Sequence, residues 1–173
     1  MKTSQILKTM KIVSWIIFIG ICIKVGAILI SFIVSLFVNQ EATKDLYLGL
    51  DLSSIYSFSP SLYVIFVFFM LFLLAVQAFI FFLVIKLFSK FDERNPFSQA
   101  TSILISKIGY SSLFAGFVAL AGTAINKWLI NQGVSVSFDW SAEEFLFMSG
   151  VIFIIGLFFK RGVEIQSENE LTI

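Results

Sequence analysis

The 173-residue sequence has no histidine and only one cysteine, Cys22, and just 13% of its residues are charged. The absence of histidine excludes histidine-ligated haem, His-containing zinc or copper sites and histidine acid–base catalysis. A lone cysteine excludes an internal disulfide and a paired-thiol relay. The net charge of +1 argues against direct nucleic-acid binding. We therefore expect no metal, no cofactor and no enzymatic activity.

What the sequence has in abundance is apolar residues. Hydrophobic residues make up 58% of the chain, and phenylalanine alone occurs 22 times. Soluble domains have roughly 45–50% apolar residues, glycine included, and about 25% charged residues. This composition is typical of a protein embedded in the lipid bilayer.

Four long apolar segments predict four membrane-spanning helices, at Ile12 to Val38, Leu62 to Phe88, Ile103 to Ile130 and Ser141 to Phe159. Each of the first three is about 40 Å long as a helix, whereas the hydrocarbon core needs only about 30 Å. These segments leave no room for a soluble domain. The expected fold is all-α, a single integral membrane four-helix bundle followed by a short tail at residues 160–173.

The distribution of basic residues predicts the orientation of these helices. One side has Lys2, Lys8, Lys11, Lys86, Lys90, Arg94, Lys107, Lys160 and Arg161, whereas the other has Lys44 and Lys127. By the positive-inside rule, both termini lie in the cytoplasm. We expect a multi-pass protein of the inner (cytoplasmic) membrane.

Residues at the segment ends predict helix boundaries. Asn95 followed by Pro96 is typical of an N-cap with proline at the first helical position. Ser141 and Glu144 have the spacing of a capping box. Gly162, after Lys160 and Arg161, indicates a helix stop.

The two loops on the outer side contain short alternations of apolar residues. Leu48, Leu50 and Leu52 alternate in the first loop, as do Val134, Val136 and Phe138 in the second. Period two is typical of a strand, so a small extracellular β-ribbon is one interpretation. Irregular loops are the alternative, with aromatic side chains at the lipid headgroups: Tyr47, Tyr56, Tyr63 and Trp140.

Small residues predict which helix faces meet, because helices in lipid associate through close contact. In the third segment they follow one helical face: Ser112, Ala115, Gly116, Ala119, Gly122 and Thr123. The first segment has a similar face with Gly20, Ala27 and Ser31, which also includes Lys24. The second segment is mostly large and apolar, so we expect it to face lipid over most of its circumference.

Lys24 lies about 20 Å beyond Lys11 along the first helix, near the bilayer centre. A lysine at this depth costs about 2.5–3.5 kcal/mol and needs a partner or a wet cavity. Glu144 has a similar predicted depth, Glu143 adjoins it, and Gln77 offers a hydrogen bond. Two interpretations remain open: a titratable or anion-attracting intramembrane site at Lys24, Gln77, Glu143 and Glu144, or a buried structural pair.

Two segments on the cytoplasmic side carry a resemblance to a known family. The first comprises Asn95, Pro96, Phe97 and Ser98. The second is the ending, with Arg161, Gly162, Glu164, Gln166, Leu171, Thr172 and Ile173. Together they resemble the bacterial domain-of-unknown-function family 2975, which is similar in size and in its four spans. Lys24 matches no motif of that family.

The resemblance implies no activity, because the family has none established. Its members are often encoded beside small helix-turn-helix regulators, which implies a membrane partner or sensor. We therefore expect a non-enzymatic membrane interaction or signalling component whose cytoplasmic tail contacts a protein. The tail either adds to its partner as a strand, docks in a groove, or remains solvated.

The alternative function is a small transporter, channel or ligand-binding subunit centred on Lys24 and Glu144. The bilayer is the first partner, and a homo-oligomer is compatible with the sequence.

Overall fold

The computed structural model describes residues 3–92, 95–136 and 138–170. Four long helices dominate it: α1 (Thr3–Phe37), α3 (Pro60–Lys90), α4 (Gln99–Asn131) and α5 (Ala142–Glu170). A 3-10 helix, η1 (Gln40–Lys44), and a short helix, α2 (Ser53–Phe58), join α1 to α3. All four long helices are long and apolar enough to cross a membrane.

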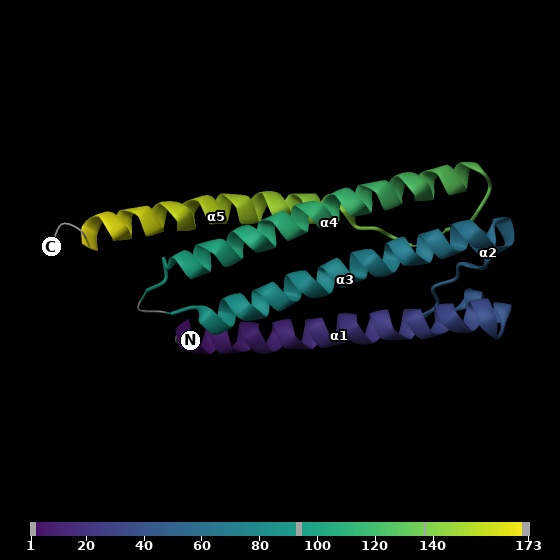
Figure 1. The fold of residues 1–173 in the computed structure, drawn as a ribbon, viewed down its shortest axis with the longest axis horizontal. Helices are drawn as coiled ribbons and strands as arrows, with labels where there is room; N and C mark the ends of the chain where they lie inside the picture. Colours follow the sequence, from purple (N-terminus) through teal and green to yellow (C-terminus); the bar gives the residue numbers. More distant parts are fainter. Residues whose placement is uncertain (1–2, 93–94, 137, 171–173) are drawn as a thin grey trace.

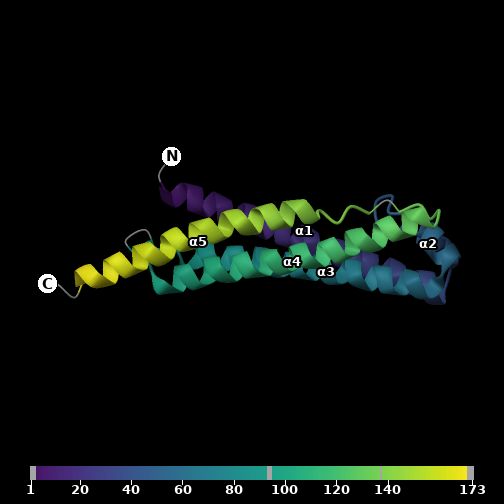
Figure 2. The same cartoon turned by 90° about the horizontal axis from the view of Figure 1, so that it is seen from above.

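The long helices form a row in the order α1, α3, α4, α5 (Figure 1). Each helix packs on the next one, whereas α1 and α5 are not a packed pair. Both chain ends lie at the same end of this row, which we call the termini end. Figure 2 shows that the row is curved, with the start of α1 and much of α5 on one side of the α3–α4 pair. The bundle is therefore open along one side.

The central position of α3 corrects the expectation that the second segment mostly faces lipid. A third of its apolar window is buried inside the protein, compared with 6% for α1. Tyr63, Phe66, Met70 and Leu73 are all buried between the neighbouring helices. Large side chains can interdigitate as well as small ones, so small residues alone did not identify this interface.

The small residues of α4 lie on a buried face, where Gly109 and Gly116 meet α5 and Gly122 meets Trp140. Ser112, Ala115, Gly116, Ala119 and Gly122 are buried, and Thr123 is half-buried. A Cβ atom at Gly116 would collide with the Leu146 side chain, and one at Gly109 would touch Ile152 and Phe153. The absence of side chains therefore sets how closely α4 and α5 approach.

The first helix packs through most of the expected face, and Gly20 is the exception. Ser14, Ile28 and Ser35 are its buried residues. Gly20 is exposed, with nothing near its hypothetical Cβ, whereas Ala27 and Ser31 are half-buried. The predicted face was wrong at Gly20 because α1 meets α3 through apolar and hydroxyl side chains rather than through backbone contact.

The helix ends also differ from the predicted ones. Ser98 caps α4, with its hydroxyl accepting from the Thr101 amide at 3.2 Å, so Asn95 is not the N-cap. Asn95 instead donates its amide to the Asp92 carbonyl in the preceding turn. Pro60 occupies the first turn of α3 behind the N-cap Ser59, a signal that the sequence analysis missed. Gly162 does not stop α5, which continues to Glu170.

The outer loops contain no strand in the residues that the structure describes. Their alternating residues form local turns, in which the Leu46 amide donates to the Leu50 carbonyl and the Leu52 amide to the Thr43 carbonyl. Leu48 has a positive φ of 46°, as does Gly49 with 84°. The predicted β-ribbon is therefore not seen, because these backbone groups are paired within the first loop.

Candidate functional site

The polar residues expected to form one intramembrane site lie on three different helices. Gln77 of α3 and Glu144 of α5 line the same groove, together with Ile80, Phe81 and Met148. This groove has a volume of about 300 Å³. Glu143 and Lys24 are not among its lining residues.

The structure does not bring Lys24 to Glu144. Lys24 is half-buried on α1, at one edge of the row, whereas Glu144 is exposed on α5, at the other. The depth comparison used only the position of each residue along its own helix, so it carried no information about which helices are neighbours. The expected ion pair is therefore wrong, and the Gln77–Glu144 groove is what remains of that site.

The loop between α4 and α5 runs back beside α4 as a strap (residues 134–136 and 138–141) before α5 begins (Figure 1). Trp140 is buried to 2% exposure, and its indole lies where a Cβ of Gly122 would be. Gly122 lies about 14 Å inside the end of α4. The acidic first turn of α5, with Glu143 and Glu144, is thereby set back from the outer end of the row.

Aromatic and polar contacts hold the strap in place. The Trp140 ring packs against Phe66 at 5.2 Å and Phe138 at 4.8 Å between centroids. Asn126 donates its side-chain amide to the Phe138 carbonyl at 3.1 Å. Trp140 and the fully buried Tyr63 are therefore covered by the protein's own side chains. An acceptor for the Trp140 indole N–H is lacking among the described residues.

The two motifs that carry the family resemblance meet at the termini end. The Phe97 ring occupies the space where a Gly162 side chain would be, and it packs on Phe159 with centroids 5.5 Å apart. Arg161 and Glu164 form an exposed ion pair at 3.0 Å on the next turn of α5. Gly162 therefore permits close contact between α5 and the α3–α4 connection.

The remaining motif residues are less constrained. Asn95 is exposed, whereas Pro96 and Gln166 are half-buried. Residues 160–170 are helical, which excludes strand addition by this part of the tail. Leu171, Thr172 and Ile173 lie outside the described residues.

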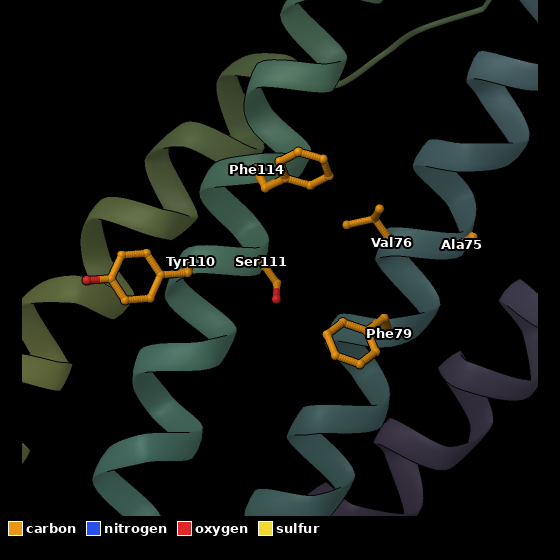
Figure 3. A pocket seen from close by; sticks show the side chains of 6 residues that line it. All are labelled: Ala75, Val76, Phe79, Tyr110, Ser111 and Phe114. Carbon is orange, nitrogen blue, oxygen red and sulfur yellow. The ribbon is translucent and has the colours of Figure 1, made fainter.

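Another groove lies between α3 and α4, with a volume of about 460 Å³. Its lining includes Val76, Phe79, Ser111 and Phe114, while Tyr110 at its rim is directed toward Phe153 of α5 (Figure 3). None of these side chains is an acid or a base. The part of the chain that the structure describes also has no group of three or more His, Cys, Asp or Glu side chains placed to hold a metal ion.

The family described as "Protein of unknown function (DUF2975)" matches residues 47–173, which is most of the chain. The chain belongs to this family. No curated protein and no solved structure matches it. The matched part of the DUF2975 protein includes α3, α4 and α5, and hence the strap, the Gln77–Glu144 groove and the contact of Phe97 with Gly162. It leaves α1 outside, and with it Lys24.

Proposed function

We propose that this DUF2975 protein is a non-enzymatic membrane component that binds a cytoplasmic protein through its termini end. The binding surface, which we call the termini surface, comprises residues 95–98 and the end of α5 from Lys160 to Glu170. The observation that supports it is the packing of Phe97 on Gly162, which joins two distant motifs into one surface.

Charge supports a cytoplasmic location for this surface. Lys8, Lys11, Lys86 and Lys90 lie toward the termini end of α1 and α3, whereas Lys44 and Lys127 lie near the opposite end. Such an excess of lysine is typical of the cytoplasmic side. By this argument the protein belongs to the inner membrane of a bacterium, with both termini inside.

The form of the surface favours docking of a helix. The end of α5 presents the exposed Ile165 beside the Arg161–Glu164 ion pair. An apolar side chain flanked by charges on a helix is a common arrangement for binding in a partner's groove. The family resemblance suggests a small helix-turn-helix regulator as this partner.

The proposal is tested by crosslinking the full-length tagged protein in native membranes and recovering what is bound. We expect the wild-type protein to capture a cytoplasmic protein. Two changes should abolish capture: G162L, which displaces Phe97, and deletion of residues 164–173. G150A is the matched control on α5, because a Cβ at Gly150 has open space around it. Capture that survives both changes contradicts the proposal.

A second candidate function rests on the Gln77–Glu144 groove, the one place where two predicted site residues share a cavity. Under this alternative the protein is a ligand-binding or transport subunit with a carboxylate at its site. E144Q should then abolish transport or a ligand response and leave partner capture unchanged. K24M should have no effect on either, because Lys24 does not line the groove.

A further inference from the structure

We propose that the protein binds one anionic phospholipid at the termini end, in a groove between α1 and α5. The occupant is identified by the chemistry of two adjoining cavities. One is apolar and accepts acyl chains, and the other is basic and accepts a phosphate headgroup.

The apolar cavity, which we call the termini groove, has a volume of about 230 Å³. All four long helices line it, with Leu7 from α1, Phe88 from α3, Ile105 from α4 and Ile155 from α5 among its residues. Because α1 and α5 do not pack on each other, the groove lies between them and its floor is formed by α3 and α4. An apolar groove of this kind, facing the bilayer, is filled by a hydrocarbon chain or by another apolar segment.

The second cavity, which we call the lysine pocket, decides between these occupants. It has a volume of about 220 Å³ and is lined by Ser4, Lys8, Lys11 and Ser89 together with Leu7, Phe88 and Phe91. The last three residues also line the termini groove, so the two cavities adjoin. A molecule that fills both must be anionic at one end and apolar at the other.

The charge of the lysine pocket is available to a ligand. Lys8 and Lys11 are one helical turn apart on α1, which places both ammonium groups on one side of the helix. Neither forms an ion pair with any residue of the described ranges, where the ion pairs are Lys44–Glu41 and Arg161–Glu164. Both lysines lie in the first three turns of α1, and basic residues just outside the hydrocarbon attract anionic lipids.

The test compares lipid binding by the full-length protein in detergent, measured by native mass spectrometry. The probes are phosphatidylglycerol and phosphatidylcholine with identical acyl chains. We expect the wild-type protein to retain one phosphatidylglycerol in preference to phosphatidylcholine. The double variant K8Q/K11Q should reduce phosphatidylglycerol affinity about 30-fold, because each lysine near a lipid surface is worth about fivefold.

The matched control is K86Q/K90Q, which removes two lysines from the same end of α3 that do not line the pocket. It should leave the preference unchanged. An equal loss in both double variants overturns the proposal, because it shows diffuse attraction rather than a site. Displacement of the lipid by inorganic phosphate at equal concentration also overturns it, because the site is then a simple anion pocket.

Filling the termini groove tests the role of the apolar cavity independently of the lysine pocket. I155W places a large ring in the groove and should weaken both lipids while preserving the preference for the anionic one. Unchanged binding of both lipids by a folded I155W protein contradicts the role of the groove. If I155W does not fold, the K8Q/K11Q comparison still decides the proposal.

Discussion

Replacing Gly122 by alanine should loosen the strap, because the Trp140 ring occupies the position that the new methyl group needs. A Cβ at Gly122 would overlap three carbons of the buried indole, which is also enclosed by Phe66, Phe69 and Phe138. Neither the α4 backbone nor the Trp140 ring can move without breaking another packing contact. The substitution therefore forces either Trp140 or the α4 backbone to move.

The expected cost follows from the size of the clash. Overpacking a well-filled core destabilises a protein by about 1–3 kcal/mol. The upper limit is the loss of the whole tryptophan contact, about 3–5 kcal/mol. At about 2–4 °C per kcal/mol for a chain of this size, a cost of about 2 kcal/mol, the middle of the overpacking range, should lower the Tm of G122A by about 4–8 °C.

The assay is thermal unfolding in detergent, followed by circular dichroism, with hydrogen exchange of residues 134–141 as a local readout. G150A is the control, since it has the same gain in helix propensity, about 0.5–1 kcal/mol, without a clash. W140L provides a second check, because a smaller side chain at this position should remove the cost of G122A. Equal Tm values for G122A and G150A, or a cost that persists beside W140L, would refute the reasoning.

Three further predictions follow from other contacts. Ser35 donates its hydroxyl to the Phe32 carbonyl, so the Tyr63 hydroxyl donates to Ser35 Oγ at 2.7 Å, joining α3 to α1. Y63F and S35A should each lower the free energy of unfolding by about 0.5–1.5 kcal/mol, and the two effects should be non-additive in a double-mutant cycle. S98A should remove the α4 cap, at a cost of about 1 kcal/mol, and increase amide exchange in the first turn of α4 but not of α3. Hydrogen bonds from the Ser53 side chain and amide lower the pKa of Asp51 below 3.8. These bonds should therefore stabilise the loop fully above pH 3.8, and this contribution should be lost as the pH falls through the lowered pKa. An acid-active protease should then cleave wild type faster at residues 51–53 as the pH falls, whereas D51A should be cleaved at this faster rate at all pH values.

The sequence predicted the number and extent of the spans because apolar length is a property of each segment alone. All four predicted segments lie almost entirely within α1, α3, α4 and α5, and an even number of crossings places both termini at one end. Which helices are neighbours cannot be read from single segments, because it depends on how two helix surfaces fit together. For that reason the extent of each span was predicted correctly, whereas the pairing of Lys24 with Glu144 was wrong.

Gly162 and Trp140 show a second limit of sequence interpretation. A glycine after basic residues is a common helix end, but here the missing side chain accommodates Phe97 from a distant loop. A tryptophan near a span end is common at headgroups, but here Gly122 provides a space for its ring. In both cases a long-range contact, which the local sequence does not report, determines the role of the residue.

The set-back start of α5 determines which part of the molecule the bilayer can cover. The strap is non-helical backbone, and such backbone cannot face hydrocarbon without losing its hydrogen bonds. We expect the hydrocarbon layer to begin near Glu144 and to be thin beside α5, since Lys160 lies only about 24 Å away along this helix. The last turns of α1 and α4 and the first turns of α3 then project beyond the membrane, where η1 and α2 cover them. The overlong helices would thus form a small platform of their own at the end of the row opposite the termini.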